Sequence, residues 1–334
     1  MTSDTDPRPL GEEEEALLSR VAWYYHHDGL TQHEVGRRLG LSRMKVSRLL
    51  EKGKRTGIIG ITIHSKHRGC LELETRLRAA HALREAIVIP ALDPAPGNAP
   101  GNAPGNAPGA SVAQLNERLA QAAASYLMPF MGDKSLLAIG WGDTVTRTVN
   151  RLGYLLGRTG ASVVTLTGGV STYVPMIGSL DPALAQAQRL YMIPSPLVVS
   201  NPSTASALMR EPAVEEVLEI ARTAAHALIG VGAMDENASF VKGGYVSVEE
   251  MHRYREAGAV GDLLGRFIDE RGRTLDLPIH DRIVGIDLEG LAGLPCLIAA
   301  AGGPQKTEAI TAVLARGILD VLITDQHTAS ALLG

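Results

Sequence analysis

The feature that most constrains the fold is the stretch 31–50, TQHEVGRRLGLSRMKVSRLL, which predicts two short helices joined by a tight turn. Val35 and Leu39 stand four residues apart, so they place one apolar stripe on the first helix. Gly40 suits the left-handed conformation that ends many helices, and Ser42 can cap the next helix by accepting a backbone hydrogen bond. The buried stripe of this second helix is expected to be Val46, Leu49 and Leu50. This arrangement is typical of a helix-turn-helix, whose second helix enters the major groove of DNA.

Positive charge is concentrated around these predicted helices. Between Arg37 and Arg68 the sequence holds ten Lys or Arg residues and one acid, Glu51, although the whole chain has a formal net charge of −4. Local positive charge on an acidic chain indicates contact with the phosphate backbone of double-stranded DNA. A solvated helical hairpin, such as a dimerisation arm, is the alternative. It does not explain why the cap, the turn glycine and the charge occur together.

Helical geometry predicts which side chains of the second helix face the DNA. With about 100° per residue and a buried stripe centred on Val46, the opposite face carries Met44, Ser47 and Arg48. Arg43 stands in the first turn, where recognition helices usually touch bases. Phosphate contacts are expected from Arg37, Arg38, Lys52, Lys54 and Arg55. The predicted DNA-binding set is Ser42, Arg43, Met44, Lys45, Ser47, Arg48 and Lys52.

The chain of 334 residues is much longer than a helix-turn-helix, so most of it must form a second domain. The expected parts are a DNA-binding domain at 13–66 that starts with an extra helix at 13–30, a linker helix at 67–84, and an effector and oligomerisation domain at 85–334. A short strand or wing is expected at 58–63. The repeated GNAP predicts a flexible surface loop at 93–110, better explained by repeat expansion than by a lid.

Composition limits where the protein can be located and which groups it can bind. There is no run of 18 apolar residues, and the first residues, MTSDTDPRPL, lack the features of a signal peptide. The two cysteines, Cys70 and Cys296, fit reduced thiols rather than a disulfide framework. No spacing typical of metal ligands is present. We therefore expect a cytoplasmic protein without membrane contact, metal or other cofactor.

From residue 85 on, apolar strand patterns alternate with helical patterns. Strands are expected at 86–91, 135–141, 162–168, 196–200, 226–232, 281–287, 297–303 and 321–325, and helices at 111–128, 144–157, 182–191, 203–209, 213–224, 249–257 and 305–316. Strands rich in β-branched residues that end in glycine, each followed by a helix, predict a mostly parallel sheet covered on both faces. The fold class is therefore α/β, Rossmann-like, behind an N-terminal helix-turn-helix.

Ligands of such sheets bind at the carboxyl ends of the strands, next to helix N-termini. The loop Gly140-Trp141-Gly142-Asp143-Thr144 ends a strand and opens a helix, which is a natural anion site. Other loops of this kind hold Gly168 and Gly169, Asp262, or Lys306. Together they predict a polar cleft for a phosphosugar-sized ligand. The alternative is that these glycines only permit close packing of strands and helices.

Several of these motifs occur in the order known from one family. LTQHEVGRRLGLSRMKVSRLLEKGKRTGI, IGWGDTV, IPSPLVVSNP, GAVGD, RIVGIDLEGL, AAGGPQKTEAI and DVLITDQHTASALL resemble the SorC/DeoR-type sugar-binding transcriptional regulators over 17–333. The resemblance implies an effector domain similar to glucosamine-6-phosphate deaminase and ribose-5-phosphate isomerase. It also implies that a sugar, sugar phosphate or polyol controls binding of a homodimer or homotetramer to operator DNA.

The resemblance also implies roles for individual residues. Gly140, Gly142 and Thr144 would hold the phosphate or anomeric end of the ligand, and Asp262 and Lys306 would hold the sugar. The full predicted effector set is Gly140, Gly142, Asp143, Thr144, Gly168, Gly169, Gln186, Asp262 and Lys306. Asp143 departs from the expected chemistry, because its carboxylate would repel a phosphate unless it points away. A neutral sugar or polyol therefore stays open as the ligand.

Two other classes of function compete with a regulator. An isomerase or deaminase fused to a DNA-binding domain needs a base and an acid with separated pKa values, and Asp262 and Lys306 could supply two groups. However, the ten His residues are scattered and no compact Asp–His–Glu arrangement is present. We therefore expect no catalytic residues. A large domain that only oligomerises would bind no sugar.

Overall fold

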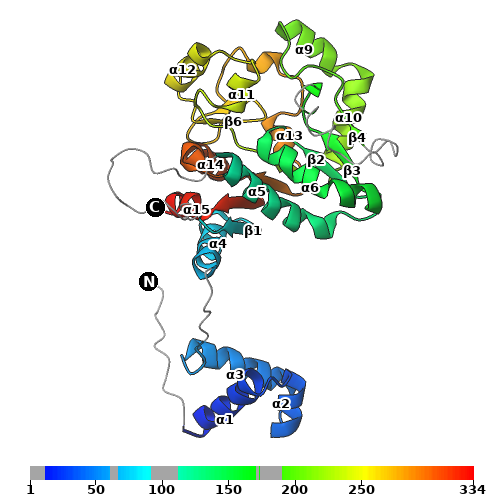
Figure 1. Ribbon diagram of the computed structural model, residues 1–334. Helices are drawn as coiled ribbons and strands as arrows, with labels where there is room; N and C mark the ends of the chain where they lie inside the picture. The colour runs from blue at the N-terminus through cyan, green and yellow to red at the C-terminus, as the bar shows by residue number, and fades with distance from the viewer. Residues whose placement is uncertain (1–11, 61–66, 92–111, 171–172, 174–189) are drawn as a thin grey trace, which may run out of the picture. The chain divides into compact units, whose positions relative to one another are not determined.

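The computed structural model describes residues 12–60, 67–91, 112–170, 173 and 190–334. The chain divides between Ser65 and Lys66 into a small N-terminal unit and a large C-terminal unit (Figure 1). Each unit is compact by itself.

The small unit is a helix-turn-helix preceded by one additional helix, as predicted. Its elements are α1 (Glu12–Ala22), a wide π-helical turn (Trp23–His27), α2 (Gln32–Leu39) and α3 (Arg43–Arg55). A capping box between Thr31 and Glu34 starts α2, and Gly40 ends it in the left-handed conformation with φ 66° and ψ 29°. The Ser42 hydroxyl accepts a hydrogen bond from the Lys45 N–H and starts α3. The small core includes Val21, Val35, Val46, Leu49 and Leu50. Of the predicted strand at 58–63, residues 58–60 form no strand, with a bend at 58–59, and the remainder lies outside the described residues.

The large unit is built on a parallel sheet of seven strands. Their order is β1 (Glu85–Ile89), β9 (Val321–Asp325), β8 (Leu297–Ala300), β5 (His226–Ile229), β2 (Leu136–Ile139), β3 (Ser162–Thr165) and β4 (Leu190–Tyr191). Because helices cover both faces, the inner strands are mostly apolar and buried, as the sequence pattern predicts, whereas the edge strands β1 and β4 are partly exposed. One core contains residues of α5 (Val112–Leu127) and α6 (Asp143–Thr159). A second contains residues of α4 (Arg68–His81), α10 (Pro212–Arg222), α14 (Thr307–Arg316) and α15 (Gln326–Leu332), and a third surrounds Phe240 and Phe267.

The remaining elements of the described residues are one hairpin, four helices and three short turns. They are the antiparallel hairpin β6 (Gly261–Leu263) and β7 (Arg266–Ile268), the helices α9 (Pro202–Met209), α11 (Ser239–Lys242), α12 (Val248–Glu256) and α13 (Leu288–Ala292), and the 3₁₀ turns Met128–Phe130, His280–Arg282 and Pro304–Lys306.

Four expectations about these elements are wrong. Segments 196–200 and 281–287 are not sheet strands. They meet each other through an isolated bridge between Val198 and Ile283 and a few neighbouring hydrogen bonds, and a 3₁₀ turn occupies part of the second segment. Residues 190–191 form the strand β4 rather than the end of a helix, while 182–189 lie outside the described residues. Asp262 lies in the hairpin strand β6, not in a loop. The helix expected at 67–84 is present as α4, and it packs on β1 and α15, with Leu73 and Leu77 buried in the large unit.

Candidate functional site: a polar cleft and a recognition helix

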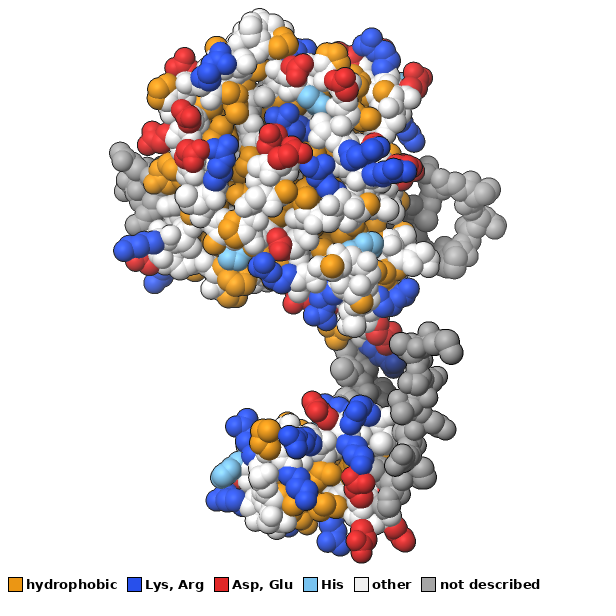
Figure 2. Space-filling view, turned by 180° about the vertical axis from the view of Figure 1, so that it is seen from behind, with side chains coloured by type: hydrophobic (Ala, Val, Ile, Leu, Met, Phe, Trp, Pro, Cys, Tyr) orange, Lys and Arg blue, Asp and Glu red, His pale blue; other side chains and the backbone are white. Residues whose placement is uncertain are grey.

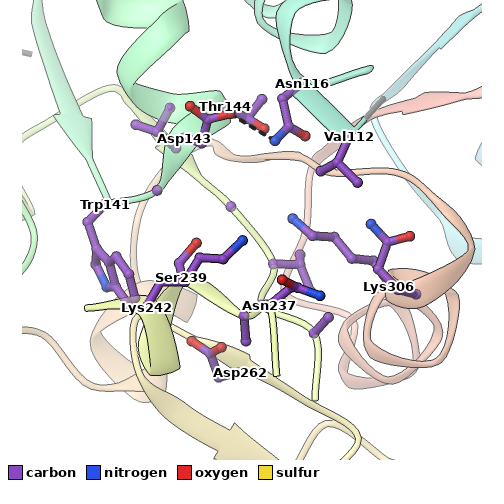
Figure 3. Close-up of a pocket in the computed structure, with 18 of the residues that line it drawn as sticks. Val112, Asn116, Trp141, Asp143, Thr144, Asn237, Ser239, Lys242, Asp262 and Lys306 are labelled. Carbon is purple, nitrogen blue, oxygen red and sulfur yellow. Dashed lines mark hydrogen bonds between the residues drawn. The ribbon is translucent and has the colours of Figure 1, made fainter. Parts of the chain in front are cut away.

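A cleft of about 800 Å³ opens in the large unit at the carboxyl ends of three neighbouring strands (Figure 3). Trp141 and Gly142 follow β2, the segment 230–233 follows β5, and Lys306 belongs to the loop after β8. The outer walls come from α5, the α11 region and the hairpin strand β6. The cleft therefore lies where open α/β sheets generally bind ligands.

Five of the predicted effector residues line this cleft: Gly142, Asp143, Thr144, Asp262 and Lys306. Gly140 lies behind them, and a Cβ there would stand 2.6 Å from Leu264 Cδ2. Gly168 and Gly169 are not among the lining residues, and their N–H groups donate hydrogen bonds to the carbonyls of Val284 and Ser195. Gly140 and Gly168 leave no room for a Cβ, so glycine at these two positions permits close packing. Gln186 lies outside the described residues.

Asp262 is the buried carboxylate of the cleft. It is 5% exposed, and its Oδ2 accepts a hydrogen bond of 2.9 Å from the Gly265 N–H. Gly232 pairs with it across an isolated bridge, and a Cβ on Gly232 would stand only 1.6 Å from Asp262 Oδ1. Burial raises the pKa of Asp262 to about 6, although the Gly265 hydrogen bond and the charge of Lys306 act in the opposite direction. The carboxyl group is thus poised to exchange a proton near neutral pH.

Two lysines point into the cleft from different elements, Lys306 from the 3₁₀ turn and Lys242 from the end of α11 (Figure 3). Neither ammonium group forms an ion pair or hydrogen bond with any residue that the structure describes. Burial lowers the pKa of Lys306, while Asp262, Asp143 and Asp235 favour its charged form. Unpaired ammonium groups in the same cleft as the N-terminus of α6 favour the binding of an anion.

Asp143 does not present a free negative charge to the cleft. Its carboxylate accepts hydrogen bonds of 2.9 Å from Arg147 Nε. It accepts another of 2.9 Å from Asn116 Nδ2 of α5 (Figure 3). Glu117 in turn binds Arg147 and Arg151, so a charge network joins α5 to α6. Gly142, with φ 129°, precedes this helix start in a conformation that glycine adopts most readily. The expected repulsion between Asp143 and a phosphate is therefore reduced by Arg147.

Several lining residues escaped prediction from the sequence: Asn116, Trp141, Asp235, Asn237, Ser239, Lys242 and Gln305. Trp141 was visible inside the glycine-rich loop, but its ring packs near Phe240 and Tyr245, which no local pattern reveals. Residues 235–242 follow β5 without helical or strand periodicity. The only usable signal was their position after a predicted strand end.

In the small unit, α3 offers an exposed face with free positive charge. Arg43, Met44, Lys45 and Arg48 are exposed, and Ser47 is half-buried. Arg43, Lys45 and Arg48 form no ion pair with the described part of the chain. Lys52 differs, because its ammonium pairs with Glu14 of α1. The Ser42 hydroxyl is engaged as the helix cap. Figure 2 shows Lys and Arg side chains distributed over this unit.

Comparison with known proteins finds matches for both units and a family for the chain. Residues 65–334 match the family model described as "Putative sugar-binding domain", and residues 11–55 match "Sigma-70, region 4". The chain is 40% identical over 323 residues to a protein named transcriptional regulator LsrR from Enterobacter sp. (strain 638), covering 96% of this chain and 93% of that protein. It is 39% identical to LsrR of Escherichia coli (strain K12), covering 96% and 95%. The chain belongs to the family of sugar-binding transcriptional regulators.

Solved structures of the family share this fold. Full-length SorC, the sorbitol operon regulator from Klebsiella pneumoniae, matches with a TM-score of 0.66 at 22% identity, covering 97% of this chain and all of that chain. The sugar-binding domain of a transcriptional repressor from Vibrio fischeri matches with a TM-score of 0.64 at 27% identity, covering 79% and 98%. The family assignment supports a regulator rather than an enzyme. In the described residues, no helix is long and apolar enough to cross a membrane, and no group of His, Cys, Asp and Glu is arranged to hold a metal ion.

Proposed function

We propose that a sugar, sugar phosphate or polyol binds in the cleft of the large unit and controls binding of operator DNA by α3. The observation that carries the proposal is the convergence of Lys242, Lys306 and Asp262 on one cleft. A buried carboxylate and nearby amide groups suit the hydroxyls of a sugar, and the ammonium groups suit an anion. The partial neutralisation of Asp143 by Arg147 favours the phosphorylated members of this ligand class.

The test is a thermal-shift screen of the full-length protein against sugars, polyols and their phosphates. We expect a phosphorylated compound to raise the melting temperature more than its dephosphorylated form, because only the phosphate engages both lysines. Lys306→Met should abolish the shift. Arg255→Met, an exposed cation of α12 outside the cleft, is the matched control and should keep it. The absence of any stabilising compound would contradict the proposal and favour a large unit that only oligomerises.

DNA binding is proposed for a cytoplasmic homodimer or homotetramer that reads a pseudo-palindromic operator through α3 of each subunit. Symmetric oligomers match operator half-sites one or more helical turns apart. Arg43, Lys45 and Arg48 have free charge for phosphates and base edges, whereas Lys52 must first leave Glu14. Sequence selection from random duplexes tests this step. A protein that enriches no sequence would contradict operator recognition.

A further inference from the structure

Met44 is an apolar side chain left outside the core of the small unit. It is 66% exposed, whereas the other long apolar residues of α3, Val46, Leu49 and Leu50, are at most 7% exposed. The core around them is complete without Met44, which belongs to no hydrophobic cluster among the described residues. The core of the small unit therefore does not require an apolar side chain at this position.

The position of Met44 is fixed by the start of its helix. It is the second residue of α3, and the hydrogen bond between the Lys45 N–H and the Ser42 hydroxyl holds this first turn. Arg43 and Lys45 stand on either side in sequence, and Arg48 follows one helical turn later on the same face. These three cations form no ion pair within the described chain. An apolar spot surrounded by free positive charge fits DNA better than a nonpolar protein surface.

We infer that Met44 reads the 5-methyl group of a thymine in the major groove, which rests on the operator binding proposed above. The thymine methyl is the apolar group that base edges present there, and apolar side chains recognise it by contact. The flexible thioether of methionine can adjust to such a small target. Arg48 lies about 6 Å farther along the helix axis, roughly two base-pair steps of 3.4 Å. The thymine should therefore lie within about two base pairs of the base that Arg48 contacts.

The test removes the methyl group from the DNA and the side chain from the protein. Full-length protein selects its operator from random duplexes, and each thymine of the half-site is then replaced by uracil, which lacks only the 5-methyl group. We expect one replacement per half-site to weaken wild-type binding about 3- to 10-fold. In Met44→Ala the uracil and thymine operators should bind equally, whereas Met44→Leu should retain most of the discrimination.

Lys45→Ala is the matched control, since it changes the neighbouring exposed side chain. It should weaken binding to all sequences alike and keep the preference for thymine over uracil. Undiminished discrimination in Met44→Ala, or no discrimination by the wild type at any thymine, would overturn the inference while leaving operator binding intact. If Met44 instead contacts a protein partner, the wild type should not discriminate between thymine and uracil at any position. Failure to select any operator would instead overturn DNA recognition itself, and the role of Met44 with it.

Discussion

At the scale of single residues, Asp262 makes the stability of the large unit depend on pH. Its folded pKa of about 6 exceeds the ordinary value of 3.8, so the folded protein binds the proton more tightly. The stabilisation is therefore complete below about pH 4 and is lost as the pH rises through 6. Asp262→Asn should remove this dependence and be more stable at pH 7.5, by up to about 3 kcal/mol. Urea unfolding at pH 5 and 7.5, followed by Trp141 in a Trp23→Phe background, measures it, since the chain has two tryptophans. An equal pH dependence in both proteins would contradict the raised pKa.

The pairing of Asp143 with Arg147 makes a second residue-scale prediction. Arg147→Ala removes the positive charge that offsets the Asp143 carboxylate next to the helix N-terminus, so a phosphorylated ligand should bind several-fold more weakly. Binding of a neutral sugar should hardly change. The double variant Asp143→Asn with Arg147→Ala should recover most of the lost affinity, because the repulsive charge is gone. Calorimetric titration of the three proteins measures the difference. Equal losses in the single and double variants would show that Arg147 acts in another way.

At the scale of elements, the turn of the helix-turn-helix depends on Gly36. A Cβ at this residue would stand 2.6 Å from the carbonyl oxygen of Leu41, so α2 and the turn approach too closely for any side chain. Gly36→Ala should therefore abolish operator binding although alanine favours helices. Ligand binding by the large unit should persist, because that unit has its own core. Gly60→Ala, with open space at its Cβ, is the control for gel-shift and thermal-shift measurements. Retained operator binding by Gly36→Ala would show that the turn can shift.

Elements were predictable where a local pattern determines them. The cap at Ser42, the stop at Gly40 and the apolar strands of the sheet follow from the chemistry of neighbouring residues. The hairpin β6–β7 was missed because each strand has three residues, too few to show alternation. Segment 196–200 has strand-like composition, yet its contacts come from residues more than 80 positions away. Lys242 could not be predicted for the same reason, since only the tertiary fold brings it opposite Lys306.

At the scale of the whole molecule, a regulator of this kind needs coupling between its cleft and its recognition helices. A ligand shifts DNA affinity only by its difference in affinity for the two states of the protein, typically ~1–3 kcal/mol. By linkage, operator DNA must change ligand affinity by the same factor that the ligand changes DNA affinity, about 5- to 150-fold. Fluorescence titrations in both orders measure the two factors. Unequal factors would mean that the two titrations do not report one coupled equilibrium.

The same coupling predicts how cleft and helix variants separate. Lys306→Met should bind operator DNA normally and lose its response to ligand, because it changes only the cleft. Arg48→Ala should weaken specific DNA binding yet leave the ligand-induced stabilisation unchanged, because the exposed Arg48 forms no ion pair in the described chain. The double variant should combine the two effects, losing the ligand response of the first change and the specific DNA binding of the second, since the two residues lie in separate compact units. If the DNA affinity of Lys306→Met still changes on adding ligand, the cleft has no role in regulation. If this variant instead fails to bind DNA, the cleft without ligand already determines the state that binds the operator.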